Sequence, residues 1–220
     1  MNYAILIPTY NEENRIQKTI KIVETNNYPY IVVNDGSTDK TLDRIISVTD
    51  KYITYNINKG KGFAIKEGAK VLIKEGYDWI VIMDADGQIQ VKDIREVLKL
   101  IDFCPEAKIL VGNRLYNPIG MPLLRLWTNK LLSNVISYLS GQKIYDSQCG
   151  LKIIHKDVFN LDLKCNRFDF ETELLVKAGK KGYKIVSRPI KCIYLEDRKS
   201  KMHPIKDALR FFKLLIKLLR

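Results

Sequence analysis

The chain has 220 residues, of which 46% are hydrophobic and 28% are charged. This length suits one well-packed α/β domain and is short for two, and the composition excludes an intrinsically disordered chain. The formal net charge of +12 favours anionic partners, such as nucleic acid, phosphorylated ligands or an acidic membrane surface.

Strand-like runs alternate with helical patterns in the first half of the chain. Short apolar runs bounded by turn residues predict strands, and apolar residues at helical spacing predict helices. The expected strands are 4–7, 30–33, 52–55, 79–83 and 108–111, and the expected helices are 13–24, 37–48, 63–74 and 91–101. This alternation predicts a mostly parallel central sheet flanked by helices on both faces.

The second half is less regular. The pattern predicts helices over 121–139 and 170–180, and strands over 151–154, 184–186 and 190–194. No internal repeat, low-complexity stretch or linker interrupts the chain. We therefore expect residues 1–202 to form a single domain, followed by a separate helix over residues 203–220.

The cysteines and the N-terminus bear on the cellular compartment. The four cysteines form no Cys-x-x-Cys pair, and with only two histidines they disfavour a zinc site. They are typical of buried thiols in a reduced cytosolic protein. A strand-like run starts at once, leaving no room for a signal peptide, and no apolar run is long enough to span a bilayer. The sequence thus predicts a cytoplasmic protein without an integral membrane segment.

Polar loops follow three of the expected strands, at residues 8–14, 34–39 and 84–88. In open parallel sheets, ligands bind beyond the carboxyl ends of the strands. These loops are therefore expected to form one site along one rim of the sheet.

Asp84 and Asp86 stand directly after the apolar run of the expected strand 79–83, with Gln88 two residues further on. Two carboxylates at a strand end suit Mg²⁺ or Mn²⁺, which bind hard oxygen ligands together with substrate phosphates. The alternative interpretation is an ordinary polar turn, because aspartate and glycine are common turn residues.

The first two loops offer groups that can recognise a nucleoside. Tyr10 can pack against a base or ribose, and Glu12 can accept hydrogen bonds from a hydroxyl or a base edge. Asp35 can accept from a donor edge of uracil or guanine, although a turn-forming aspartate is the alternative. The basic, glycine-rich segment 58–62 lacks the spacing of a P-loop, and no dinucleotide-binding fingerprint is present.

Five motifs occur in order along the chain, at residues 7–12, 33–39, 58–62, 84–88 and 148–152. Together they resemble the family 2 inverting glycosyltransferases of the GT-A fold, and most closely the dolichyl- or polyprenyl-phosphate sugar synthases. The resemblance covers nearly the whole chain. It implies a metal-dependent hexosyltransferase that moves mannose or glucose from GDP-mannose or UDP-glucose to dolichyl or polyprenyl phosphate.

The resemblance also implies roles for individual residues. The nucleoside would be held by Pro8, Tyr10, Glu12, Val33 and Asp35, and the ribose and diphosphate would meet Asp84, Ala85 and Asp86. Asp86 and Gln88 would bind the metal directly, with Asp84 supporting them.

Cations would bring the two negatively charged substrates together. Arg114 matches an arginine near the phosphates and the reacting sugar, and Arg125 matches one that faces the acceptor phosphate. Lys201, in a Ser-Lys pair, matches a lysine that covers the donor diphosphate. The family often has an arginine where this chain has Cys192, and Arg198 is the candidate to replace its charge.

The acceptor is open at this level. A phosphate nucleophile is already anionic and needs no base, whereas a sugar hydroxyl in a growing glycan requires a carboxylate general base. Asp169, Glu171 and Glu173 could supply that base, contact sugar hydroxyls, or simply stabilise the start of a helix. Two further alternatives are nucleotidyl transfer, disfavoured by the first loop, and a nucleic-acid-binding module. No nucleic-acid motif is recognised, so we expect no nucleic-acid partner.

The segment 203–220 combines a broad apolar face with a stripe of lysines and arginines. Such a helix suits the surface of an anionic membrane, and it suits equally a position docked on the domain's own sheet. The first interpretation predicts a peripheral protein on the cytoplasmic face of the membrane.

Overall fold

The computed structural model describes residues 2–87 and 89–191, together with Leu214 and Leu218. Its strands are β1 (Tyr3–Thr9), β2 (Tyr30–Asp35), β3 (Tyr52–Tyr55), β4 (Trp79–Met83), β5 (Ala107–Asn113), β6 (Leu151–His155) and β7 (Lys184–Pro189). Its α-helices are α1 (Ile16–Thr25), α2 (Thr41–Ile46), α3 (Lys61–Lys74), α4 (Val91–Leu98), α5 (Leu100–Phe103), α6 (Leu123–Ser140) and α7 (Asp169–Lys180). Two 3₁₀ turns, η1 (Arg114–Tyr116) and η2 (Lys156–Asn160), follow β5 and β6.

The described strands form one seven-stranded sheet in the order β3-β2-β1-β4-β6-β5-β7. The prediction of an α/β fold with a mostly parallel central sheet is confirmed. The exception is β6, which runs antiparallel to both of its neighbours, β4 and β5. Its reversal places the start of β6 beside the ends of β4 and β5, and this matters for the site.

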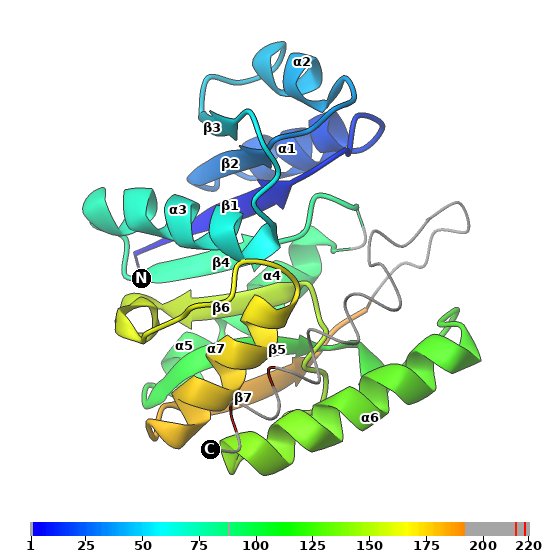
Figure 1. Cartoon of the computed structure of the whole chain (residues 1–220), viewed down its shortest axis with the longest axis vertical. Helices are drawn as coiled ribbons and strands as arrows, with labels where there is room; N and C mark the ends of the chain where they lie inside the picture. Colours follow the sequence, from blue (N-terminus) through cyan, green and yellow to red (C-terminus); the bar gives the residue numbers. More distant parts are fainter. Residues whose placement is uncertain (1, 88, 192–213, 215–217, 219–220) are drawn as a thin grey trace.

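The centre of the sheet is the core of the protein. Every residue of β2 and β4 is buried, as is all of β1 after its first residue, because helices cover both faces of these strands. In Figure 1, α3 and α7 lie in front of the sheet, and α1 and α4 lie behind it. The near-continuous apolar sequences of these strands reflect this two-sided burial.

The predicted elements are all present up to β7, with shifted ends. The helix expected from residue 37 begins only at Thr41, and the helix expected over 91–101 divides into α4 and α5. The strand expected over 190–194 is wrong where it can be checked, because Ile190 and Lys191 lie beyond the end of β7. Its remaining residues fall outside the described part of the chain.

Two residues of the C-terminal segment are described. Leu214 and Leu218 are helical, and both are buried within the main hydrophobic cluster. Lys180 at the end of α7 donates a hydrogen bond to the carbonyl oxygen of Leu218. These contacts match the interpretation in which the C-terminal helix docks on the domain. Across the described ranges, none of the helices has the length and apolarity needed to cross a membrane.

Candidate active site

The strand register brings the predicted polar loops to one rim of the sheet. β1, β2 and β4 are parallel neighbours and end together at this rim. Met83 at the end of β4 pairs with Leu151 at the start of β6, and Val111 near the end of β5 pairs with Lys152. The rim therefore gathers the loops after β1, β2, β4 and β5, and it adds the loop 146–150, which precedes β6.

The loops after β1 and β2 are joined by hydrogen bonds. Asn11 has a left-handed backbone (φ 51°), and its backbone N–H donates to Ser37 Oγ at 3.0 Å. The backbone N–H of Thr38 donates back to Asn11 Oδ1 at 2.8 Å, and that of Glu12 donates to Thr41 Oγ1 at 2.7 Å. The two loops thus form one frame rather than two independent turns.

The residues expected to hold a nucleoside lie within this frame. Pro8 and Val33 are register partners on neighbouring strands, Glu12 is buried, and Tyr10 is half-buried. The structure therefore brings these four residues together at one end of the rim. Their contact with a nucleoside stays a prediction.

Asp35 anchors the basic, glycine-rich loop before α3. Its two carboxylate oxygens accept from the backbone N–H groups of Lys59 at 2.9 Å and Gly60 at 2.6 Å. The side chain of Asn58 donates to the carbonyl oxygen of Asp35 at 3.2 Å. Gly60 has φ 108°, a conformation that only glycine adopts at low cost. Asp35 thus fixes a loop, a role that its sequence context did not reveal.

Lys61, the first residue of α3, lies between the half-buried carboxylate of Asp84 and the buried carboxylate of Glu171. Its Nζ is 2.7 Å from Asp84 Oδ1 and 2.9 Å from Glu171 Oε1. Lys152, fully buried on β6, lies 3.4 Å from the same Glu171 oxygen and donates to the carbonyl oxygen of Cys149. These four side chains, Lys61, Asp84, Lys152 and Glu171, form what we call the lysine–carboxylate network.

The network sets the protonation of its members. Burial alone would raise the pKa of Glu171, but the ammonium groups of Lys152 and Lys61 outweigh it and lower the pKa to about 2. Burial also raises the pKa of Asp84, and the nearby Asp86 and Glu171 carboxylates add to this rise while Lys61 opposes it. For Lys61, the two carboxylates outweigh burial and raise the pKa. Glu171 is therefore an ionised structural anion.

The remaining atoms around Asp84 leave little space. A Cβ atom added to Gly150 would lie 2.4 Å from Asp84 Oδ2, so only glycine allows this approach. The hydroxyl of Thr19 on α1 donates to the carbonyl oxygen of Ala85 at 3.3 Å, and Asp86 is buried. With Lys61 on α3 in front of the sheet and Thr19 on α1 behind it, the Asp84–Asp86 segment is held from both faces.

The donor set at this segment fits a divalent ion shared with substrate. No three His, Cys, Asp or Glu side chains in the described residues are grouped to hold a metal by themselves. Mg²⁺ commonly binds through one or two carboxylates plus substrate phosphates, and Asp86 can supply one of them. Because Lys61 engages Asp84, that side chain suits the supporting role expected for it.

Arg114 makes a buried, bidentate ion pair with Asp146. Arg114 Nε and Nη2 donate to the two carboxylate oxygens at 2.8 and 2.9 Å, and its backbone N–H donates to Asp146 Oδ2 at 3.0 Å. Asp146 is completely buried. The expected phosphate-binding arginine thus also fixes the loop before β6. Asp146 was missed as a site residue, and no signal in the sequence pairs it with Arg114.

The loop before β6 is held on its other side by α6. The backbone N–H of Ser147 donates to Ser133 Oγ at 2.9 Å, and the two hydroxyl oxygens lie 3.2 Å apart. Arg125, expected to face the acceptor phosphate, lies half-buried in the first turn of α6. One helix therefore supports a site loop and carries a candidate substrate-binding residue.

The acidic cluster at the start of α7 is engaged in local contacts. Glu173 Oε2 accepts from the backbone N–H of Cys165 at 2.7 Å, and its Oε1 lies 2.7 Å from Lys177 Nζ. Burial opposes ionisation of Glu173, but these partners lower its pKa. Asp169 accepts from the backbone N–H of Arg167 at 3.2 Å. Together with the paired Glu171, these contacts favour a structural role for the cluster.

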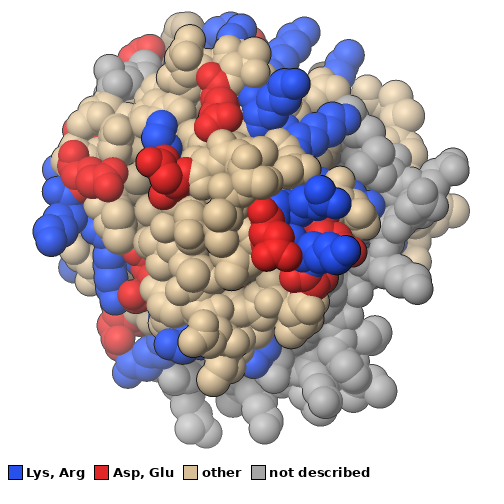
Figure 2. Space-filling model, turned by 90° about the horizontal axis from the view of Figure 1, so that it is seen from above, with Lys and Arg blue, Asp and Glu red and all other residues tan. Residues whose placement is uncertain are grey.

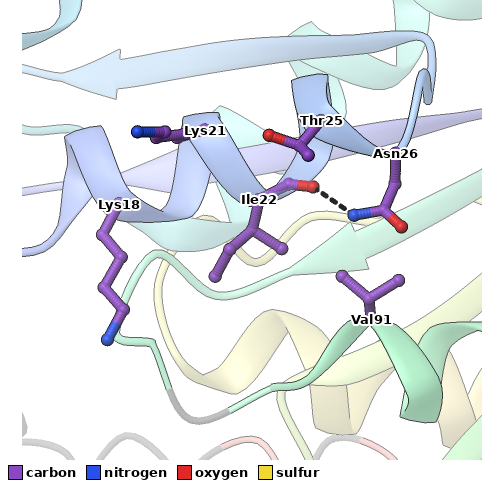
Figure 3. A pocket seen from close by; sticks show the side chains of 6 residues that line it. All are labelled: Lys18, Lys21, Ile22, Thr25, Asn26 and Val91. Atoms are coloured by element: carbon purple, nitrogen blue, oxygen red, sulfur yellow. Dashed lines mark hydrogen bonds between the residues drawn. The ribbon is translucent and has the colours of Figure 1, made fainter.

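Several expected site residues lie outside the described part of the chain: Gln88, Cys192, Arg198 and Lys201. Figure 3 shows a groove in another place, between α1 and α4, where Ile22 and Val91 face each other. Lys18, Lys21, Thr25 and Asn26 complete its lining. None of these six residues belongs to the predicted site.

Comparisons with known proteins agree with the motifs. The family model described as "Glycosyl transferase family 2" matches residues 4–160. A UDP-N-acetylglucosamine–dolichyl-phosphate N-acetylglucosaminyltransferase of Methanococcus voltae is 32% identical, over 87% of this chain and 86% of the relative. The dolichyl-phosphate beta-glucosyltransferase ALG5D of Trichomonas vaginalis is 30% identical, over 90% of this chain and 68% of that relative.

A solved structure shows the same fold. Glucosyl-3-phosphoglycerate synthase from Mycobacterium tuberculosis, in complex with Mn²⁺, UDP-glucose and glycerol 3-phosphate, superposes with a TM-score of 0.69. The alignment covers 99% of this chain and 78% of that one at 16% identity, which supports the fold alone. The expected GT-A-type fold is confirmed. With the motifs gathered at one rim and the family model matching most of its length, the chain belongs to glycosyl transferase family 2.

Proposed function

We propose that this glycosyltransferase moves a sugar from a nucleoside diphosphate sugar to a dolichyl or polyprenyl phosphate. The observation that carries this proposal is the state of the buried glutamates in the first turns of α7. Glu171 and Glu173 are tied to lysines that lower their pKa values, so they are poor general bases. An anionic phosphate nucleophile needs no such base, whereas a sugar hydroxyl does.

The relatives support the same acceptor class. The names of two of them include dolichyl phosphate, and each of the two aligns over most of this chain. Their names include both N-acetylglucosamine and glucose, so we extend the expected donors to UDP-N-acetylglucosamine. GDP-mannose and UDP-glucose remain candidate donors.

In the proposed complex, Pro8, Tyr10, Glu12, Val33 and Asp35 frame the nucleoside. Asp84 and Ala85 line the diphosphate. Asp86, with Gln88 and the donor phosphates, would hold Mg²⁺ or Mn²⁺, which offsets charge on the leaving diphosphate. Lys61 keeps Asp84 in place from the first turn of α3.

Cationic side chains then orient the two phosphate groups. Arg114, fixed by Asp146, is proposed to lie near the reacting sugar, Arg125 to face the acceptor phosphate, and Lys201 to cover the donor diphosphate. The oxygen of the acceptor phosphate attacks the anomeric carbon as the bond to the diphosphate breaks, so the configuration inverts. Because the acceptor's lipid chain lies in a membrane, the enzyme is proposed to act at a membrane surface, which we propose is the cytoplasmic face.

The test incubates purified protein with Mg²⁺ or Mn²⁺, polyprenyl phosphate in detergent, and labelled GDP- and UDP-sugars. We expect label in the lipid phase with one donor, loss of the product with a chelator, and its loss in Asp86→Asn. Asp162→Asn, which alters an exposed carboxylate, is the control and should retain activity. Transfer to a free glycan without lipid product would discard the lipid-phosphate acceptor.

A further inference from the structure

The helix α6 exposes a row of large apolar side chains along its outer face. Its buried residues are mostly polar: Asn129, Ser133, Ile136 and Ser140. Its exposed face holds Leu123, Leu124, Trp127, Leu131 and Tyr138, which we call the α6 surface. Leu124 is 81% exposed and Trp127 is 69% exposed. An ordinary surface helix has the opposite arrangement, with its apolar stripe toward the core.

Specific contacts hold α6 in this orientation. Ser133 accepts from the backbone N–H of Ser147, and Ser137 Oγ accepts from that of Ile144 at 2.9 Å. A Cβ atom added to Gly179 on α7 would lie 2.4 Å from the carbonyl oxygen of Ser140, so the two helices are in close contact. Turning the apolar face inward would break these contacts. The α6 surface is therefore fixed outward.

The chain segment that carries the α6 surface has charge of one sign. Residues 117–145 include no aspartate or glutamate, but they include Arg125, Lys130 and Lys143. Lys130 Nζ lies 5.8 Å from the ring centre of Trp127, and Lys143 Nζ lies 5.7 Å from that of Tyr145. By contrast, acidic and basic side chains are interspersed on the face of the molecule shown in Figure 2. Aromatic and aliphatic side chains in a segment whose charged residues are all cations suit an anionic lipid surface.

The α6 surface adjoins the candidate active site. In Figure 1 the N-terminal end of α6 lies on the side of the molecule toward which β1 and β7 point, which is the side of the site rim. Tyr116 and Ile119, in the connection from η1 to α6, are also strongly exposed. A membrane in contact with α6 would therefore lie beside the loops that hold the proposed acceptor.

We infer that the α6 surface docks on a lipid bilayer that contains anionic headgroups. The leucines and Trp127 enter the acyl boundary, while Lys130 and Lys143 contact the headgroups. Pairing of α6 with α6 of a second copy would bring the same cations together, which disfavours a dimer through this face. The inference goes beyond the proposed function, because docking needs no sugar nucleotide. It rests on the proposed function in one respect only: that function explains why the protein would bind a membrane.

Vesicle flotation tests the inference with the full chain and no substrate. Vesicles of equimolar phosphatidylcholine and phosphatidylglycerol are compared with vesicles of phosphatidylcholine alone. A triple variant changes Leu124, Trp127 and Leu131 to Gln, and its partitioning into the anionic vesicles should fall by at least about tenfold. The matched control changes three exposed apolar residues outside α6 to Gln, namely Ile46, Ile57 and Phe103, and should bind as the wild type does.

Each other outcome has a defined meaning. Unchanged vesicle binding by the α6 triple variant, with thermal unfolding showing it folded, overturns the inference and assigns binding to another segment. Unchanged vesicle binding with loss of a dimer in sedimentation velocity also overturns it, because a second copy is then the occupant. Wild-type vesicle binding without sugar transfer refutes the proposed function and leaves the docking surface standing.

Discussion

Lys61 shows how a residue's role depends on what surrounds it. In the sequence it belongs to a basic, glycine-rich loop whose composition suggests phosphate binding. In the structure only 16% of its side chain is exposed, and its ammonium group pairs with both Asp84 and Glu171. A cation between two carboxylates that are shielded from solvent offsets part of the desolvation cost of both. The residue thus supports the segment that is proposed to bind the metal.

Replacing Lys61 by methionine tests this role. Lys61→Met leaves the buried Glu171 and the half-buried Asp84 without their shared cation, so we expect a loss of about 3 kcal/mol in the free energy of unfolding. Lys70→Met is the control on the same helix, because Lys70 is 73% exposed and its pair with Glu67 is a surface contact. That control should change stability by less than about 0.5 kcal/mol in urea unfolding. Equal effects of the two substitutions would refute the network.

Glu171 makes the stability depend on pH in a predictable direction. Its pKa is about 2 in the folded protein against 4.5 for the free side chain. A depressed pKa stabilises the fold above pH 4.5, and this stabilisation is lost as the pH falls toward 2. The whole difference is worth at most about 3 kcal/mol.

The measurement compares unfolding free energies at several pH values between 6 and about 3. Glu171→Gln should lose less stability on acidification than the wild type, since the group that binds a proton on unfolding is gone. Glu75→Gln, at an exposed position after α3, serves as the control. A Glu171→Gln variant with the pH dependence of the wild type would show that the pKa of Glu171 is not depressed.

Among the elements, β6 decides the architecture of the site. Because it runs against β4 and β5, its preceding loop returns to the rim where those strands end. The buried Arg114–Asp146 pair and the Ser133–Ser147 contact then fix this loop between η1 and α6. Gly150, which has no side chain, allows the residue before β6 to lie directly against the carboxylate of Asp84.

Gly150→Ala tests the close approach of the two segments. The added Cβ would overlap Asp84 Oδ2, so we expect a destabilisation of about 2 kcal/mol and reduced sugar transfer. In an Asp84→Ala background the same change should cost less, because the overlapping carboxylate is absent. A double-mutant cycle on unfolding free energies should give a coupling of about 1 kcal/mol or more. Additive effects would contradict the contact.

At the scale of the whole molecule, the C-terminal segment contributes to the core. Leu214 and Leu218 are separated from α7 by more than thirty residues, yet both join its hydrophobic cluster. The expected division at residue 203 stays a prediction, although these two side chains beyond it pack within the domain. The membrane role expected for the segment stays a prediction, and α6 offers a second apolar surface.

Leu218→Ala measures this contribution. Truncating a buried leucine removes apolar burial and leaves a cavity, so we expect a loss of about 2 to 4 kcal/mol in the free energy of unfolding. Leu124→Ala, at an exposed position of α6, is the matched control and should change stability by less than about 0.5 kcal/mol. A neutral Leu218→Ala would show that the side chain of Leu218 does not stabilise the domain.

Local patterns were sufficient for the central strands and for the rim, although they wrongly predicted a strand at Ile190 and Lys191. The apolar runs at β1, β2 and β4 are continuous because both faces of these strands are covered, so they were recognisable without any tertiary information. Parallel strands with crossover helices place their carboxyl ends together, and this geometry located the loops around Tyr10, Asp35 and Asp86. The ordered motifs then identified the family.

Tertiary structure alone decided the direction of β6, the partners of Lys61 and Asp146, and the outward face of α6. Strand direction depends on which neighbours a strand pairs with, and buried ion pairs join residues that are far apart in sequence, as Lys61 and Glu171 are. The hydrophobic pattern of α6 identifies an apolar stripe but not the side that faces the domain. Polar contacts from Ser133 and Ser137 settle that orientation, and periodicity carries no information about such contacts.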